Sequence, residues 1–227
     1  MHTKDFYNAY YSKKVVNTNK TFEEFFYNIL KKYEKSRYAV ISDFINRLWY
    51  TNKNILDLGC WEWYFFEFLD KGNHLYGIDI AWVRLEKNKN KFHLLEWDLE
   101  AKFPWEDNFF DIITSMSVME HVFSVEHHLS EAYRLLKKWG LFILEVPNVA
   151  FLPNRIRLLV WNNPITWDWA EAWDDNHLHY FTQHRLKKYL IKFWFTVEKV
   201  TWSWIFATLR SWWPSLLCGD LVYICRK

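Results

Sequence analysis

Three acidic residues in the first half of the chain each lie at or near the end of a short apolar run. Asp57 lies near the end of NILDLG, Asp79 near the end of HLYGIDI and Asp98 near the end of KFHLLEWDL. A carboxylate at such a place can accept hydrogen bonds from the hydroxyls of a ribose. The fingerprint G-x-G-x-x-G does not follow Gly59, which disfavours a dinucleotide-binding oxidoreductase. The three carboxylates therefore favour a neutral or cationic nucleoside ligand.

The elements that must position these acids follow from the pattern of apolar residues. Strands are predicted at 54–59, 74–80, 91–99, 109–118, 141–148, 196–201 and 221–227, and helices at 63–72, 124–138 and 184–193. Because strands alternating with helices form parallel βαβ units, we expect an α/β fold with a Rossmann-like, doubly wound sheet. Ligands of such sheets bind beyond the carboxyl ends of the strands, where the three acids lie.

We expect residues 1–227 to form a single domain with four parts. N-terminal helices occupy 1–50, where the segment 21–35 opens with a capping box. The cofactor-binding half follows at 51–148. Residues 149–182 break the alternation and are interpreted as a substrate cap, and a C-terminal helix and strands occupy 183–227. Within the cap, 151–161 is either a lid over the substrate or an amphipathic covering helix.

Charge and composition limit the partners. The formal net charge of +2 comes from 29 basic and 27 acidic residues, so nothing favours nucleic acid or an anionic membrane as a partner. The three cysteines show no metal-binding spacing, which favours a reducing, cytoplasmic compartment. No apolar stretch approaches the ~18 residues of a membrane span. The oligomeric state stays open.

Five segments carry a family resemblance in a fixed order. They are DLGC (57–60), GIDI (77–80), FPWEDNFFDIITSMSVMEHV (103–122), EAYRLLKKWGLFILEVPN (131–148) and HLHYFTQHRLKKYLIKFWF (177–195). Together they resemble the class I S-adenosylmethionine-dependent methyltransferases of the small-molecule, ubiquinone-biosynthesis-like type. The resemblance implies S-adenosylmethionine as cofactor and a small-molecule methyl acceptor. It also implies a seven-stranded sheet of order 3-2-1-4-5-7-6, with strand 7 antiparallel and helices on both faces.

The resemblance also implies roles for single residues. Asp57 and Gly59 would form the turn under the methionine part of the cofactor. Asp79 would hold the ribose, and Asp98 would meet the adenine. The other residues implied at the cofactor are Ile80 and Leu99, which would flank the adenine, and Ser115, which would line the floor of the site.

The pair Glu120-His121 follows the fourth predicted strand. His121 is the candidate catalytic base, because an imidazole can take a proton near neutral pH; a histidine at a helix start, satisfied by backbone, is the alternative. In the ubiquinone branch, relatives that hold a divalent metal at such a pair use a further upstream glutamate. Ser117 stands at that place here, so we expect no metal. His177 and His179 are further candidates to face the substrate, whereas the neighbours His127 and His128 are interpreted as a solvated helix face.

Glycine and tryptophan occur in unusual numbers. The chain has 5 glycines and 16 tryptophans, whereas average usage would give roughly 16 glycines. Relatives would carry glycine at 61, 63, 139 and 194, and position 161 lies in a loop context where glycine is ordinary; all five are tryptophan here. We interpret this as the replacement of glycine by tryptophan, for which deliberate engineering, a sequence-handling artefact and natural drift are the alternatives. Natural drift is the least favoured of the three, because one residue type is replaced so consistently.

Two of these tryptophans fall in the predicted cofactor turn. At 61 and 63 an indole would resist a left-handed backbone and would project towards the cofactor. We therefore expect methyl transfer that is impaired by Trp61 and Trp63. The alternative is a catalytically inert methyltransferase-fold domain that acts as an interaction module.

Overall fold

The structure is a computed structural model. It describes residues 37–48, 50–60, 64–69, 72–81, 91–167, 170–171, 177–201 and 213–227. The helix predicted within 21–35 and the tryptophans Trp61 and Trp63 lie outside these residues.

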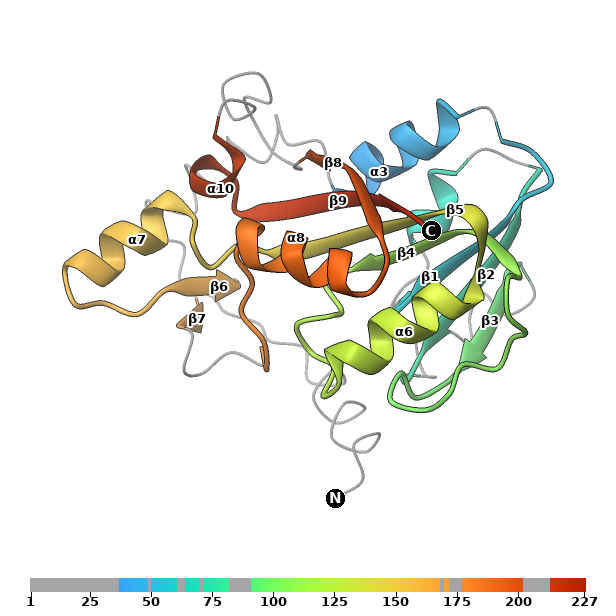
Figure 1. The fold of residues 1–227 in the computed structure, drawn as a ribbon, viewed down its shortest axis with the longest axis horizontal. Helices are drawn as coiled ribbons and strands as arrows, with labels where there is room; N and C mark the ends of the chain where they lie inside the picture. Colours follow the sequence, from blue (N-terminus) through green and yellow to red (C-terminus); the bar gives the residue numbers. More distant parts are fainter. Residues whose placement is uncertain are drawn as a thin grey trace, which may run out of the picture.

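Seven strands form one sheet (Figure 1). Their bounds are β1 (Asn54–Leu58), β2 (His74–Asp79), β3 (His93–Glu96), β4 (Phe110–Met116), β5 (Leu136–Pro147), β8 (Thr196–Thr201) and β9 (Asp220–Arg226). Their order is β3-β2-β1-β4-β5-β9-β8. The first five strands are parallel to one another, and β9 is antiparallel to both β5 and β8. The expected order is confirmed, because β8 and β9 are the sixth and seventh strands of this sheet along the chain.

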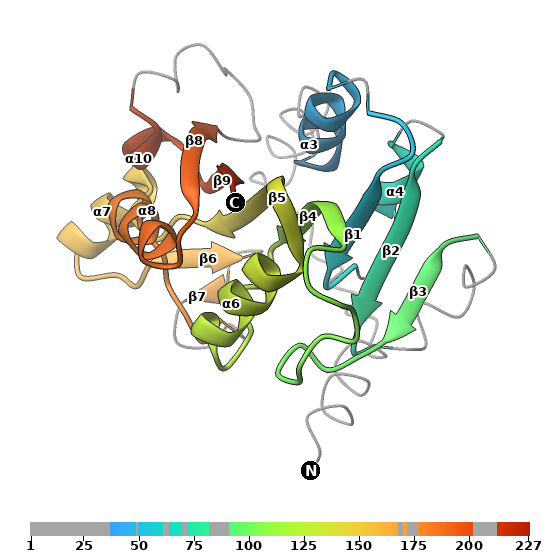
Figure 2. The ribbon, with the colours of Figure 1, turned by 45° about the vertical axis from the view of Figure 1, so that its right-hand side comes forward.

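Helices lie on both faces of the sheet, as expected (Figure 2). The described helices are α3 (Arg37–Asn46), α4 (Tyr64–Glu67), α6 (Val125–Leu135), α7 (Leu152–Leu159), α8 (Gln183–Lys192) and α10 (Pro214–Leu217). A second small sheet pairs β6 (Ile165–Trp167) with β7 (Ala170–Glu171). Among the described helices, none has the length and apolar character needed to cross a membrane.

The central strands fill two separate cores because successive side chains point to opposite faces. Leu56 and Leu58 of β1 pack with α6 and α8 in one core, whereas Ile55 packs with α3 and α4 in the other. Leu144 and Ile143 of β5 divide between the cores in the same way. Strands that are buried on both faces read as continuous apolar runs, which is why they could be found in the sequence.

The helix predicted at 124–138 is too long. It begins after Ser124, whose side chain accepts a hydrogen bond from the His127 N–H, and it ends at Leu135. Leu136 is fully buried and pairs with Phe110 as the first residue of β5. Strand pairing thus overrides the helical preference of the lysines that follow. The helix predicted at 63–72 is likewise shorter in the structure, where α4 covers only Tyr64–Glu67.

Three described tryptophans have a left-handed backbone. The φ angles are 67° at Trp139, 59° at Trp161 and 65° at Trp194. Trp139 lies within β5, where the pairing with β4 shifts register, and the other two directly follow the ends of α7 and α8. All three indoles are exposed, Trp161 to 95%. Glycine is the residue that usually occupies such positions.

The cap after α8 shows why glycine would be ordinary there. The Trp194 N–H donates to the carbonyl of Ile191 at 3.0 Å, and the Phe195 N–H donates to the carbonyl of Leu190 at 3.1 Å. This pair of bonds is the Schellman motif, which requires a left-handed residue at the position of Trp194. The same two bonds recur at Trp161 after α7. At these sites the backbone geometry, apart from any family likeness, favours glycine.

We predict that Trp161→Gly stabilises the fold. Relief of the left-handed cost of about 1–2 kcal/mol outweighs the extra chain entropy of glycine in the unfolded state, about 0.4–1 kcal/mol. The expected gain is therefore roughly 1 kcal/mol in the free energy of unfolding, measured in urea. As control, Trp105→Gly should destabilise by about 2 kcal/mol or more, because the half-buried Trp105 packs against the core residue Phe110. A loss of stability in Trp161→Gly would contradict the prediction.

Candidate active site

The carboxyl ends of β1, β2 and β4 meet at one edge of the sheet. Asp57 pairs in register with Gly77 of β2 and with Thr114 of β4, and Asp79 is the last residue of β2. Asp57 is 3% exposed and Asp79 is 8% exposed. The structure therefore brings together two of the predicted cofactor acids, both nearly buried.

Asp57 is held inside the sheet by one short hydrogen bond. The Thr114 hydroxyl donates to Asp57 Oδ1 at 2.6 Å. Burial raises the pKa of Asp57 to about 7, and the charge of Asp79 adds to the rise, while the Thr114 bond opposes it. A carboxyl group of raised pKa next to a second acid is typical of a functional site.

Gly59 forms the turn that the sequence predicts after β1. Its φ is 67°, and its N–H donates to the carbonyl of Ile78 at 2.8 Å. A Cβ atom at this position would lie 2.4 Å from Val118 Cγ2, which is impossible without movement. Both the backbone conformation and the contact therefore require glycine at 59.

Asp79 is oriented by the turn that follows β2. Its Oδ1 accepts a hydrogen bond from the Ala81 N–H at 2.8 Å, and its carbonyl accepts one from the Trp97 N–H at 2.9 Å. Ile80 lies half-buried beside it. This places the acid at the sheet edge, as predicted; its role at a ribose stays a prediction.

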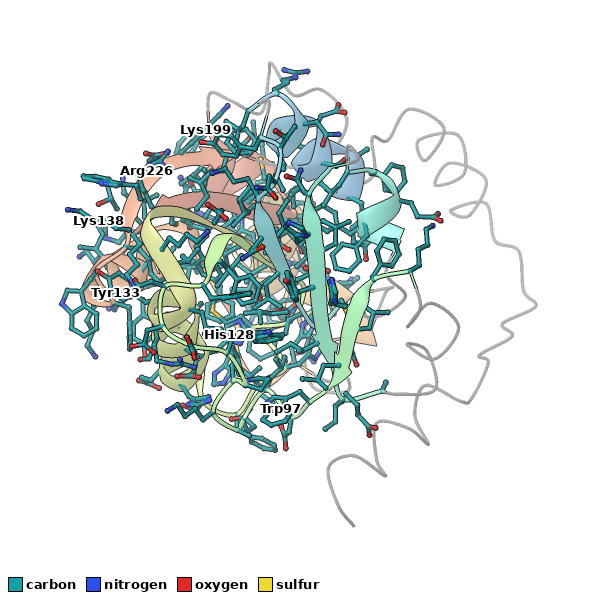
Figure 3. All side chains as sticks on the ribbon, turned by 90° about the vertical axis from the view of Figure 1, so that its right-hand side faces the viewer. Trp97, His128, Tyr133, Lys138, Lys199 and Arg226 are labelled. Carbon is teal, nitrogen blue, oxygen red and sulfur yellow. The ribbon has the colours of Figure 1, made fainter. Side chains whose placement is uncertain are left out.

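Asp98 and Leu99 follow the end of β3, the neighbour of β2. The Asp98 carboxylate is exposed and accepts a hydrogen bond from the Glu100 N–H at 3.0 Å, whereas Leu99 is half-buried against the core. Trp97 has no positive φ, and its indole N–H donates to the carbonyl of Lys102 at 3.2 Å (Figure 3). The adenine-side roles of Asp98, Leu99 and Ile80 stay predictions.

Ser115 has a partner that the sequence did not suggest. The residue is fully buried, and its hydroxyl lies 3.0 Å from His128 Nε2 on α6. Burial lowers the pKa of His128 to about 4, so this imidazole is neutral at pH 7. The bond ties β4 to α6 in the interior; the predicted role of Ser115 at the floor of the cofactor site stays a prediction.

The interpretation of His128 as a solvated residue is wrong. The side chain is fully buried, and Figure 3 shows it inside the molecule. Its position explains this, because His128 follows Val125 by three residues and precedes Leu129, and both are buried on the face of α6 that packs against the sheet. His127, in contrast, lies off that face and bonds the carbonyl of Ala101 through Nε2 at 3.0 Å.

The turn after β4 brings together a carboxylate and two imidazoles. Glu120 is 1% exposed, His177 is 8% exposed and His121 is half-buried. His177 Nε2 lies 3.9 Å from Glu120 Oε1, and the rings of His121 and His177 pack with centroids 4.7 Å apart. His121 thus lies among other potential ligand and base groups, and its predicted catalytic role stays a prediction.

Backbone hydrogen bonds dock the segment of His177 on this turn. The N–H groups of Leu178 and His179 donate to the carbonyl of Glu120 at 2.8 and 3.1 Å, and His179 Nε2 donates to the carbonyl of Val122 at 2.9 Å. The sequence marked His177 as a candidate but gave no sign of its closeness to Glu120. No local pattern encodes a contact between segments so distant along the chain.

Sequence reasoning missed Glu145. This residue of β5 is fully buried and accepts a hydrogen bond from the Ser117 hydroxyl at 2.8 Å. Ser117 itself has a φ of 52°, unusual for a residue other than glycine, and donates its N–H to the Glu145 carbonyl at 3.1 Å. Strained backbone of this kind is often found at functional sites. The available signal was an acid within the apolar run LFILEVPN.

Comparison with known families decides the classification. The model of a methyltransferase domain family matches residues 33–200, which include the strands β1 to β5 and the segment of His177. The chain belongs to this methyltransferase family. The resemblance seen in the sequence is therefore confirmed at the level of the family.

Individual methyltransferases agree with this. A protein of Mycolicibacterium smegmatis named "probable S-adenosylmethionine-dependent methyltransferase" is 27% identical over 110 residues, 45% of this chain and 42% of that protein. The match thus spans less than half the length of this curated relative. An S-adenosylmethionine-dependent methyltransferase of Archaeoglobus fulgidus has a similar fold, with a TM-score of 0.60, 18% identity, and coverage of 91% of this chain and 100% of its own. One from Methanosarcina mazei has a TM-score of 0.59, 18% identity, and coverage of 81% and 96%.

We predict that Asp57→Asn removes a pH-dependent loss of stability. An unfolded aspartate has a pKa of about 3.9, and that of folded Asp57 is about 7. The folded state therefore binds the proton of Asp57 more tightly than the unfolded state does. The stability that this proton contributes is complete below pH 4 and is lost as the pH rises to 7. The free energy of unfolding of Asp57→Asn, relative to that of the parent, should thus rise between pH 4 and 8, by at most about 4 kcal/mol. Urea unfolding at several pH values measures this difference.

The matched control is Asp98→Asn, which removes an exposed carboxylate at the neighbouring strand end. If both variants gave the same dependence on pH relative to the parent, burial of Asp57 would not be the cause.

Proposed function

We propose that this chain transfers the methyl group of S-adenosylmethionine to a small-molecule acceptor. The observation that supports this best is the sheet edge where Gly59, Asp57 and Asp79 meet, in a chain that belongs to a methyltransferase family. When bound, S-adenosylmethionine supplies a methyl group on a positively charged sulfonium. A nearly buried pair of carboxyl groups suits a cationic ligand better than a phosphate.

The residues present fit this cofactor. Gly59 provides the left-handed turn after β1, where a Cβ would clash with Val118, so only glycine fits at this point of the proposed cofactor turn. Asp79 would hold the ribose hydroxyls, and its carboxylate is already fixed by the Ala81 N–H. The residues proposed at the adenine are Ile80, Asp98 and Leu99.

Methyl transfer requires mainly that the acceptor and the methyl group be held in line, because the acceptor attacks opposite the departing sulfur. The residues of the chain would align the acceptor and exclude water. Segment 149–182, which contains α7, β6 and β7, is proposed as the part that covers the acceptor. Glu120, His121 and His177 lie where this segment meets the turn after β4.

The second candidate function is an inert domain that binds a partner, and one observation favours it. Apolar side chains are exposed along α7 and just beyond it, namely Ile156, Leu158, Leu159, Val160 and Trp161. Exposed apolar groups in one place are typical of interaction surfaces. This candidate would be supported if the chain did not bind the cofactor and changing Trp61 and Trp63 to glycine did not restore binding.

We predict that cofactor affinity is weak in the chain as it stands and rises when Trp61 and Trp63 are both changed to glycine. A left-handed turn costs a side chain about 1–2 kcal/mol, so the gain should be about tenfold or more. Calorimetric titration with S-adenosylmethionine measures it. Adding Asp79→Asn to the glycine variant should reduce the affinity again.

The matched control changes Trp61 and Trp63 to alanine. Alanine would remove the indole but keep the cost of the left-handed backbone that the sequence leads us to expect there, so its gain should be smaller than that of glycine. Micromolar or tighter binding by the unchanged chain would contradict the expected impairment, and no binding by any variant would contradict the proposed cofactor site.

A further inference from the structure

We propose that Glu120, His121 and His177 bind a divalent ion of the first transition series, represented by Zn²⁺. One carboxylate oxygen and one nitrogen from each ring all lie within 4.8 Å of one another. The ligands come from the turn after β4 and from the docked segment at 177–181. The upstream position that led us to expect no metal is occupied by Ser117, and His177 supplies a third ligand from elsewhere in the chain.

The donor set selects the type of ion. Two imidazole nitrogens and one carboxylate oxygen form the protein ligands of zinc sites that keep an open position, and of non-haem iron sites. Mg²⁺ and Ca²⁺ prefer oxygen donors throughout. The cluster therefore favours Zn²⁺ and its neighbours over the alkaline-earth ions.

The distances are close to those that a metal needs. Two ligands at about 2.1 Å from one ion can be at most about 4.2 Å apart. Glu120 Oε1 and His177 Nε2, at 3.9 Å, already meet this limit. All three donor atoms lie within 4.8 Å of one another, so any excess over this limit is at most about 0.6 Å, which a small rotation of the half-buried His121 can supply.

The surrounding structure holds the ligands in place before an ion arrives. The carbonyl of Glu120 accepts two backbone N–H groups from the residues after His177. Two of the ligands are nearly buried, and the half-buried His121 leaves a side for entry. A cation would offset the cost of burying the Glu120 carboxylate.

The position of the site indicates a role in acceptor binding, a step that rests on the proposed function. Val118, two residues before Glu120, touches the cofactor turn at Gly59. An ion with an open position would bind an acceptor through an oxygen donor and make its hydroxyl proton easier to lose. The acceptor class inferred is thus a small molecule with a hydroxyl group. Its proton would leave to water, and its oxygen would take the methyl group as the carbon–sulfur bond breaks with both electrons staying on sulfur.

The test is calorimetric titration of the chelator-treated chain with Zn²⁺. We expect one ion per chain, and a melting temperature that rises with Zn²⁺ concentration. Glu120→Gln and His177→Gln should each weaken binding by at least about tenfold. The control His127→Gln changes an imidazole outside the cluster and should bind Zn²⁺ as the parent does.

Several outcomes would overturn the site. Equal Zn²⁺ affinity in the parent, Glu120→Gln and His177→Gln would do so, as would Mg²⁺ binding as tightly as Zn²⁺. Should the variants fail to fold, Co²⁺ is added to the parent instead. Ligation by nitrogen and oxygen gives visible absorption bands, and the absence of these bands overturns the proposal. The titration needs no S-adenosylmethionine, so failure of the metal site and failure of the proposed function are distinguishable.

A second inference rests on the backbone alone. Trp139, Trp161 and Trp194 share a left-handed φ, although two lie at helix ends and one lies in a strand irregularity. Trp105, which is half-buried and packs against the core, has no positive φ. Tryptophan thus stands where glycine fits, at sites of unrelated structure. A common cause in the codon explains this better than a separate cause at each site. We infer that a codon translated here as tryptophan is decoded as glycine in the source organism.

The gene and the natural protein test this inference. The codons at 139, 161 and 194 should be identical and should differ from the codon at Trp105. Mass spectrometry of the protein purified from its source should find glycine at the three positions. A shared codon at Trp105 and Trp161, or tryptophan in the peptide that contains residue 161, would overturn it.

Discussion

The contact between Gly59 and Val118 is the constraint on which the site depends. The turn after β1 lies so close to the turn after β4 that even a Cβ at 59 would be 2.4 Å from Val118 Cγ2. The same turn is fixed to β2 through the carbonyl of Ile78. Two residues beyond Val118 lies Glu120. The proposed cofactor side and the Glu120 side are therefore packed directly against each other.

The buried Asp57 shows what this packing costs. Its carboxyl group lies between β1 and β4, bonded to Thr114 and close to the charge of Asp79. Burial opposes ionisation here, so the chain gives up stability at neutral pH to keep an acid at this place. Such local conflicts between stability and composition are expected at functional sites and rare elsewhere. The sheet residues around Asp57, among them Leu56 and Leu58, are fully buried and apolar, which offsets this cost.

The sequence predicted some features well because they are local. The parallel strands were visible as apolar runs, and the acids at their ends had to share an edge. The order of the strands, with β9 between β5 and β8, came from the family resemblance, since pairing across long connections leaves no local pattern. The helix expected at 124–138 was predicted too long for the same reason: the conformation of Leu136 is set by its pairing with Phe110, a contact that leaves no local pattern. His128 was misjudged when two adjacent histidines were given one environment, although adjacent positions on a helix point in different directions.

The left-handed tryptophans bear on the whole fold as well as on the cofactor turn. Each costs about 1–2 kcal/mol, so the three together cost roughly 3–6 kcal/mol. A domain has a net stability of only about 5–15 kcal/mol. Trp161 recovers little of this by packing, since its indole is 95% exposed, whereas the Trp194 ring packs on Tyr133 with centroids 5.7 Å apart. Glycine at these sites would keep every hydrogen bond of the two helix caps, because those bonds use only backbone groups. The fold therefore needs the left-handed backbone at these positions, and at Trp161 it gains almost nothing from the side chain.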